Sequence, residues 1–287
     1  MAGNIFQKLT QFEGVASGGI ATRRIDAFGK FHGITLRCLE ADGDTLTWAN
    51  VKTHIEEIRI ELSADAIYTV TPEFFETMRT YYHGSAPTDG CFYIPLKPSW
   101  WANRALANVY AWGTEGLPVG SIVVQIRFKT PGTFLLSRIE AVVDLTVADE
   151  QLGAYFAIER FPQSFENTGL LEVSAFPTDP TDVVLAYIIH SETAGIKAKI
   201  KTVEFKANSV AMRTRIEPVF LDRAQQEVGR TPGGDFVVVD FNHDDNASDY
   251  LPLSSIARQA LTFDFSTAPN GFDIYRLRLG GTSPQAV

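Results

Sequence analysis

The stretch IEEIRIELSADAIYTVTPEFFETMRTYYHG, residues 55–84, has a counterpart 145 positions further along, where residues 200–229 read IKTVEFKANSVAMRTRIEPVFLDRAQQEVG. The two segments align without a gap and share five identical positions: Ile55/Ile200, Ala66/Ala211, Thr69/Thr214, Phe75/Phe220 and Gly84/Gly229. In both, alternating apolar and polar residues predict two strands joined by a short turn, and the period then changes to that of a helix. Proline at the start of each predicted helix and glycine after it are typical of helix ends.

Flanking blocks recur in the same order on both sides of this pair. The matching blocks are 32–40 with 184–192, 90–94 with 234–238, 124–128 with 261–265, and 139–145 with 274–280. A fixed order of matching blocks is the mark of an internal repeat. The sequence therefore predicts a tandem duplication of one β-rich domain.

The length of 287 residues suits two domains, and the 20 phenylalanines favour strands. Predicted strands lie at 22–28, 32–39, 55–62, 66–70, 91–96, 122–128 and 137–145, and again at 183–190, 200–207, 211–216, 235–241, 260–265 and 272–279. We predict an all-β protein of two tandem eight-stranded jelly-roll β-sandwiches, each with one short helix. The predicted division is an N-terminal arm at 1–20, a first jelly roll at 21–145, a connector at 146–182, a second jelly roll at 183–280 and a C-terminal tail at 281–287.

Charge and terminal sequence narrow the class of protein. The net charge of −9 argues against a nucleic-acid-binding surface, which needs clustered Lys and Arg. The N-terminus lacks the basic and apolar regions of a signal peptide, and no apolar run is long enough to span a bilayer.

In the arm, Ile5, Phe6, Leu9 and Phe12 predict one face of a short helix that packs on its own domain or a neighbour, with a membrane surface as the alternative. Cys38 and Cys91 lie in apolar strand patterns and are expected to be buried free thiols.

The sequence contains none of the common catalytic motifs, and we expect no enzymatic activity. One acidic cluster follows a strand of the second repeat, where Asp240, Asn242 and Asp244 present alternate oxygens like the opening of a calcium loop. Asp245 replaces the required glycine and Leu251 the terminal glutamate. A solvated acidic loop without a cofactor is favoured, and a bound calcium is the alternative.

A long segment between strands, residues 97–121, holds the densest aromatic residues of the chain: Trp100, Trp101, Tyr110 and Trp112. Loops of this length inside a compact domain are usually functional or form an interaction surface. Packing within the chain or against another subunit is favoured, and stacking on a sugar is the alternative.

Tandem sandwiches without a catalytic site resemble the double jelly-roll major capsid proteins of tailless icosahedral, membrane-containing bacteriophages of the corticovirus type. Three stretches carry the resemblance: 55–84, the run Tyr110–Leu117 that leads into the strand 122–128, and the entry to the second repeat from Phe165 to His190.

The resemblance implies a structural role. Proteins of this kind form homotrimers with a pseudo-hexagonal outline, and the trimers tile an icosahedral shell over an internal membrane, where they meet neighbouring trimers and vertex and membrane-associated proteins. It also implies synthesis in the cytoplasm of a bacterial host and location in the virion capsid. The segment 97–121 becomes a candidate tower or intersubunit contact, and the arm a candidate inner contact.

The alternative function is a two-domain jelly-roll protein that binds or cleaves glycans, with Trp100, Trp101 and a carboxylate as its site. The lack of a signal peptide and of a disulfide framework argues against extracellular work on glycans.

Overall fold

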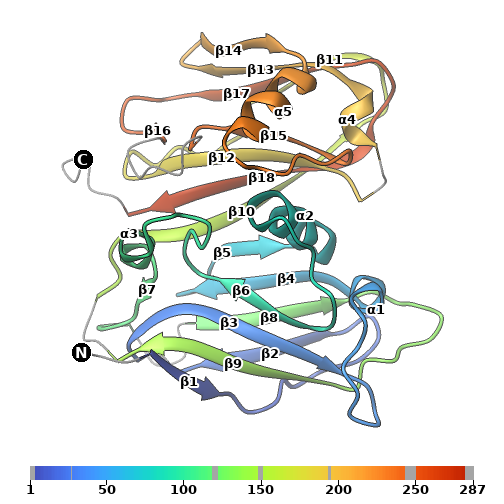
Figure 1. Cartoon of the computed structure of the whole chain (residues 1–287), viewed down its shortest axis with the longest axis vertical. Helices are drawn as coiled ribbons and strands as arrows, with labels where there is room; N and C mark the ends of the chain where they lie inside the picture. The colour runs from blue at the N-terminus through green and yellow to red at the C-terminus, as the bar shows by residue number, and fades with distance from the viewer. Residues whose placement is uncertain are drawn as a thin grey trace. The chain divides into compact units, whose positions relative to one another are not determined.

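The computed structural model describes residues 4–26, 28–117, 122–147, 151–192, 195–242 and 250–281. The chain separates into two compact units (Figure 1). Unit 1 comprises Met1–Arg79 and Ser85–Glu159, and unit 2 comprises Thr80–Gly84 and Arg160–Val287. Apart from the short segment Thr80–Gly84, the chain passes from unit 1 to unit 2 between residues 159 and 160, inside the predicted connector 146–182.

Unit 1 is a sandwich of two four-stranded sheets. Its main strands are β1 (Asn4–Lys8), β2 (Ile20–Ile25), β3 (Lys30–Leu39), β4 (Ile55–Leu62), β5 (Asp65–Val70), β6 (Cys91–Pro95), β8 (Ile122–Phe128) and β9 (Arg138–Thr146). One sheet has the order β1-β9-β3-β6, to which the two-residue β7 (Trp112–Gly113) adds on β3, and the other has the order β2-β8-β4-β5.

Unit 2 repeats this arrangement. Its main strands are β10 (Tyr155–Phe165), β11 (Gly169–Val173), β12 (Val183–His190), β13 (Ile200–Ala207), β14 (Val210–Ile216), β15 (Phe236–Asp240), β17 (Gln259–Phe265) and β18 (Asn270–Gly280). They form the sheets β10-β18-β12-β15 and β11-β17-β13-β14, and the two-residue β16 (Leu251–Pro252) pairs with β12. Numbered by their place among the eight main strands of each unit, the strands of one sheet follow the order 1-8-3-6 and those of the other the order 2-7-4-5. This order is that of the jelly roll, and the predicted fold class is confirmed.

The duplication extends to the backbone angles of the repeated segment. The turn between β4 and β5 has positive φ at Ser63 and Ala64 (52° and 74°), and the turn between β13 and β14 has it at Asn208 and Ser209 (49° and 71°). These positions differ by the same 145 residues as the sequences. Two consecutive positive φ angles are typical of the tight turn that suits a twisted hairpin.

The helices that follow the hairpins also correspond. They are α2 (Pro72–His83) and α5 (Pro218–Glu227), and Gly84 and Gly229 after them have φ of 71° and 79°. Glycine adopts this left-handed conformation without the cost that a Cβ atom brings, so it ends both helices.

Three predictions about local structure are wrong. Each unit has more than one helix, because the short helices α1 (Trp48–His54), α3 (Arg104–Val109) and α4 (Ile196–Lys199) are too brief to show a helical period. The arm forms strand β1 instead of a helix, since its backbone pairs with β9 from Asn4 to Lys8. The predicted connector contains β10 and β11.

The cysteines differ in exposure. Both are free, Cys38 is buried and Cys91 is exposed, so the prediction of two buried thiols holds for Cys38 alone. The alternation of β6 turns Phe92 inward and therefore Cys91 outward. Burial raises the pKa of the Cys38 thiol to about 12.

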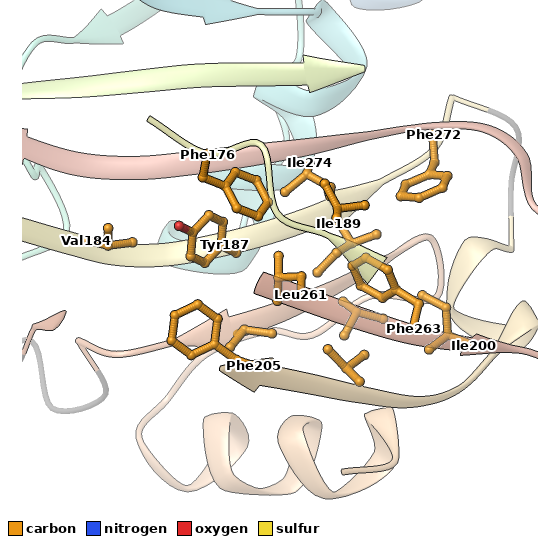
Figure 2. Packing of buried hydrophobic residues seen from close by; sticks show 14 of the residues in the cluster. Phe176, Val184, Tyr187, Ile189, Ile200, Phe205, Leu261, Phe263, Phe272 and Ile274 are labelled. Atoms are coloured by element: carbon orange, nitrogen blue, oxygen red, sulfur yellow. The ribbon is translucent and has the colours of Figure 1, made fainter. Parts of the chain in front are cut away.

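The core of each unit lies between its two sheets. In unit 2, side chains of β12 and β18 meet those of β13 and β17, with Tyr187, Phe205 and Phe263 among the largest (Figure 2). The alternation of apolar residues along β17 sends Leu261, Phe263 and Phe265 inward. Burying such side chains stabilises a domain by roughly 1.5–3 kcal/mol each. No helix in the described part of the chain is both long and apolar enough to cross a membrane.

Candidate assembly surface

An exposed apolar surface lies on the repeated segment of unit 2. Strand β14 exposes every residue from Val210 to Arg215, and helix α5 exposes Val219 and Phe220. We call the four large apolar side chains Val210, Met212, Val219 and Phe220 the β14–α5 face. Each is between 47% and 67% exposed. Exposed apolar residues that gather on neighbouring elements mark interaction sites more often than singly scattered ones do.

The corresponding elements of unit 1 are buried. In β5, Ile67, Tyr68 and Val70 have almost no exposure. In α2, Phe75 is fully buried between the rings of Trp48 and Phe92, at centroid distances of 6.0 and 5.3 Å. This part of the repeated segment is therefore buried in unit 1 and exposed in unit 2.

The edges of β5 and β14 differ as well. Besides β4, strand β5 has a second neighbour, because Ile158 in the first part of β10 pairs with Tyr68 in parallel orientation. Both residues belong to unit 1. Among the strands that the structure describes, β14 pairs with β13 alone. Its outer edge presents backbone N–H and C=O groups with no strand beside them.

A shallow groove of about 640 Å³ lies beside the N-terminus of α5. Its lining includes Lys197, Lys201, Pro218, Val219 and Asp222. Lys197 forms an ion pair with Asp222 and donates to the carbonyl of Gly233 at 2.6 Å, so its charge is already matched within unit 2. The groove continues the β14–α5 face, with which it shares Val219.

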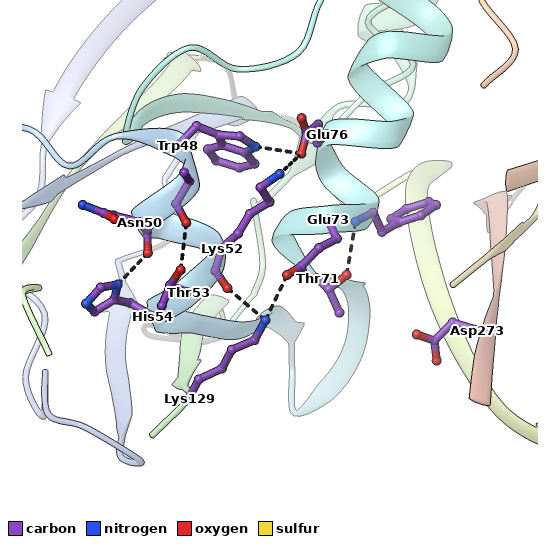
Figure 3. A network of polar contacts seen from close by, with 12 residues as sticks. Trp48, Asn50, Lys52, Thr53, His54, Thr71, Glu73, Glu76, Lys129 and Asp273 are labelled. Atoms are coloured by element: carbon purple, nitrogen blue, oxygen red, sulfur yellow. Dashed lines mark hydrogen bonds and ion pairs between the residues drawn. The ribbon is translucent and has the colours of Figure 1, made fainter. Parts of the chain in front are cut away.

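In unit 1 the equivalent region, around Lys52, is contacted by the chain between β8 and β9, from which Lys129 reaches Lys52 and Glu73 (Figure 3). Lys129 donates to the Lys52 carbonyl and to Glu73 Oε1, both at 2.9 Å. Phe134 packs on the rings of His54 and Phe128 at 5.3 and 5.7 Å. This connection spans residues 129–137, whereas the one between β17 and β18 spans only 266–269. The shorter connection leaves the groove of unit 2 open.

The neighbouring polar contacts fix α1 against α2 in unit 1. Glu76 accepts from the Trp48 indole at 3.1 Å and from Lys52 at 2.7 Å (Figure 3). His54 Nδ1 donates to the Asn50 carbonyl at 2.5 Å, and His54 Nε2 accepts from the backbone N–H of Leu135 at 2.8 Å. The donor and acceptor of a neutral imidazole are thus both used, which indicates a structural histidine.

Two of the predicted calcium ligands are seen in the described residues, and the third, Asp244, lies outside them. Asp240 is buried, and its Oδ1 accepts from the Asn242 N–H at 2.8 Å while its Oδ2 accepts from the Tyr81 hydroxyl at 3.1 Å. Burial and the Asp240 charge raise the pKa of Tyr81, so the hydroxyl stays protonated and donates. In the parts of the chain that the structure describes, no group of three His, Cys, Asp or Glu side chains could hold a metal.

The aromatic residues of 97–121 pack within unit 1. Trp100 and Trp101 are 9% and 2% exposed. The ring of Trp100 meets that of Phe156 at 5.5 Å, and Trp101 meets Tyr110 at 5.4 Å. The indole N–H of Trp112 donates to the Phe156 carbonyl at 3.0 Å. The three tryptophans have almost no exposed face on which a sugar could stack, so the structure does not support the glycan site.

The N-terminal strand β1 is a second exposed edge. Ile5 and Phe6 are 44% and 70% exposed. Among the described strands, β1 pairs with β9 alone, and this pairing holds its backbone against unit 1 while its outer edge has no neighbour.

Comparison with protein families assigns both units. A model described as the viral coat protein P2 N-terminal domain matches residues 6–142, and one described as the viral coat protein P2 C-terminal domain matches residues 157–277. The chain belongs to the viral coat protein P2 family. Viral coat proteins of this family are structural, and the predictions of a capsid protein without enzymatic activity and of location in the virion capsid are confirmed at this level.

Solved structures agree on the fold. The major capsid protein P2 from bacteriophage PM2 matches with a TM-score of 0.77 at 16% identity, covering 99% of this chain and all of that one. A PBCV-1 virus capsid chain matches with a TM-score of 0.65 at 10% identity, covering 100% and 97%. A chain of Sulfolobus Turreted Icosahedral Virus matches with a TM-score of 0.64 at 13% identity, covering 98% and 91%. No curated protein sequence gives a significant match.

The sequence did not reveal the exposure of the β14–α5 face. A signal for it exists in the differences between the two repeats. Where α2 has Phe74 and Met78, the corresponding positions of α5 are Val219 and Arg223, and β14 carries Arg213 and Arg215. A charged copy of a buried element indicates that the copy has a different environment.

Proposed function

We propose that the protein is a major capsid protein whose copies associate as homotrimers, with the β14–α5 face as the contact between subunits. One observation carries this proposal: the face is exposed in unit 2, while its counterpart in unit 1 is buried within the chain. Two copies of one domain that start from the same fold are expected to use the same surface. In the second copy that surface needs a cover from outside the chain.

The size of the face suits a contact between subunits. Removing a side chain such as Val, Met or Phe from water contributes roughly 1.5–3 kcal/mol when burial is complete. Four such side chains lie between the start of β14 and the first turn of α5, and with the groove beside Val219 they would supply the apolar part of an interface. The Arg213 guanidinium lies 6.0 Å from the ring of Phe241 and leaves the apolar side chains of β14 uncovered.

A contact between the second jelly roll of one copy and the first of the next is head-to-tail. Such contacts either close into a ring or grow without limit. A closed ring of three chains, each with two similar jelly rolls, would contain six similar jelly rolls and have a pseudo-hexagonal outline. This geometry allows trimers to tile an icosahedral shell.

The remaining partners follow from this role. The shell would enclose an internal membrane, and the trimers would meet neighbouring trimers and vertex and membrane-associated virion proteins. The net charge of −9 supports contact with proteins in preference to direct contact with the genome. Synthesis would take place in the cytoplasm of a bacterial host before assembly.

The test is the solution mass of the purified protein, measured by light scattering during size-exclusion chromatography. A 31.7 kDa chain predicts about 95 kDa for a closed ring of three. A mass that stays at 95 kDa on tenfold dilution supports the proposal. A monomer at every concentration would contradict it.

A further inference from the structure

Strands β14 and β1 are both sheet edges with exposed apolar side chains. On β14 these are Val210 and Met212, and on β1 they are Ile5 and Phe6. Natural proteins usually cover or interrupt a strand edge, because its open N–H and C=O groups pair readily with another strand. In the described residues no proline and no covering element lies at either edge, and β14 has two register shifts of the bulge type in its pairing with β13.

Unit 1 shows how the equivalent edge is covered. The fifth strand of its jelly roll, β5, is bordered by β10 in parallel orientation at Ile158 and Tyr68. Strand β10 is also the first strand of the second jelly roll, where it lies beside β18. The fifth strand of the first jelly roll is therefore bordered by the unit 1 part of β10, the strand that continues into the second jelly roll.

The fifth strand of the second jelly roll is β14, and no further jelly roll follows it in the described chain. The first strand that matches β10 in the repeated order is β1, which lies beside β9 as β10 lies beside β18. We infer that residues 5–11 of one copy lie along the outer edge of β14 in a neighbouring copy, as an added parallel strand.

This inference rests on the proposed trimer and names the segment that its β14–α5 face receives. The added strand would satisfy the open backbone groups of both edges, as strand addition does in peptide recognition. Its exposed side chains match the new neighbour, because one of Ile5 and Phe6, which point to opposite faces of the sheet, would lie beside Val210 or Met212 as an apolar cross-strand pair. In a ring of three chains each β1 and each β14 is used once, so neither of these two edges is left to recruit a further copy.

Disulfide trapping tests the pairing directly. Exposed Cys91 is first replaced by Ser, while Cys38 is fully buried and stays. Met212→Cys is then combined with Phe6→Cys, Lys8→Cys or Thr10→Cys in three separate chains. Neighbouring strands bring Cα atoms within the roughly 4.4–6.8 Å that a disulfide needs, and positions two residues apart sample the register. All four sites are exposed, so the substitutions leave the core intact.

The matched control is Leu170→Cys in place of Met212→Cys. Leu170 is 60% exposed and lies on β11, at the opposite edge of the same sheet. Mild oxidation is followed by denaturing electrophoresis without reductant, and the native mass is measured in parallel.

We expect one of the three Met212→Cys chains to form covalent dimers and trimers at least tenfold more than its Leu170→Cys counterpart. Trimers in solution whose three Met212→Cys chains all stay at the control level would overturn the strand pairing and leave the proposed function standing. Chains that are monomeric in solution would overturn both.

Discussion

Phe75 and Phe220 occupy the same position of a duplicated segment, 145 residues apart, and their surroundings are opposite. Phe75 is fully buried among aromatic rings of unit 1, and Phe220 is 63% exposed on unit 2. The strands, turns and helices that carry them agree almost residue for residue. The comparison shows that duplication preserved the local structure of the segment while the burial of its outer surface changed. In a coat protein this difference leaves the second copy with a surface available for assembly.

The largest expected effect is a difference in stability between variants of Phe75 and of Phe220. Phe75→Ala removes a fully buried ring and leaves a cavity, so we expect it to lower the free energy of unfolding by about 3–5 kcal/mol. Phe220→Ala removes an exposed ring and is expected to change the stability of the dissociated chain by less than about 0.5 kcal/mol. Urea unfolding monitored by circular dichroism measures both. Equal losses in dissociated chains would show that Phe220 is buried within its own subunit.

The next effect separates stability from association. Phe220→Asp places a charge on the β14–α5 face, and we expect association to weaken at least tenfold, which is about 1.4 kcal/mol. Sedimentation velocity over a range of concentrations measures the change.

The control for this variant is Leu170→Asp, which places the same charge on a side chain of similar exposure at the other edge of the sheet. It is expected to leave the mass unchanged. If the two variants dissociate the protein equally, the contact does not lie on the β14–α5 face.

A smaller effect should be the same in both copies. Ala64 and Ser209 occupy equivalent turn positions with φ of 74° and 71°. Glycine adopts this conformation at no steric cost, so Ala64→Gly and Ser209→Gly are each expected to stabilise by up to about 1 kcal/mol. Thermal unfolding of the two variants measures this. Opposite signs would mean that the hairpins are less alike than their backbone angles indicate.

The smallest effect concerns calcium, which would distinguish unit 2 because the acidic loop has no counterpart in unit 1. Both carboxylate oxygens of Asp240 already accept hydrogen bonds. We therefore expect calorimetry of metal-free protein to show no heat of calcium binding. A saturable heat that disappears in Asp244→Asn would identify a site that uses Asp240, Asn242 and Asp244.

The sequence predicted most of the fold because the repeated elements carry regular patterns. The strands at 55–62, 122–128, 183–190 and 200–207 have the predicted bounds, and α2 begins at a proline and ends before a glycine as predicted. The short helices escaped prediction because four to seven residues complete at most two turns. Strand β1 was predicted as a helix because Ile5, Phe6 and Leu9 fit a helical face, whereas backbone pairing with β9 decides its conformation.

The candidate surface was harder to predict than the elements that carry it. Val219 and Phe220 look like core residues in the sequence, because an apolar side chain on a helix is usually buried. The aromatic residues of 97–121 present the opposite case, since Trp100 and Trp101 suggested a surface and are buried. In both cases the missing information is which distant segment lies above the side chain.

The sequence by itself determined the duplication, the alternation of each strand, the helix ends at Gly84 and Gly229 and the class of protein. These depend on interactions between residues close in the chain and on a pattern written twice. Only the tertiary structure decided that β5 is bordered by β10, whereas β14 has β13 as its one neighbour among the described strands. It also decided that a groove lies beside Lys197, whereas Lys129 and Phe134 contact the equivalent region of unit 1. Whether a side chain is buried depends on which segments from elsewhere in the sequence cover it. No local pattern specifies which of two similar copies those segments will cover.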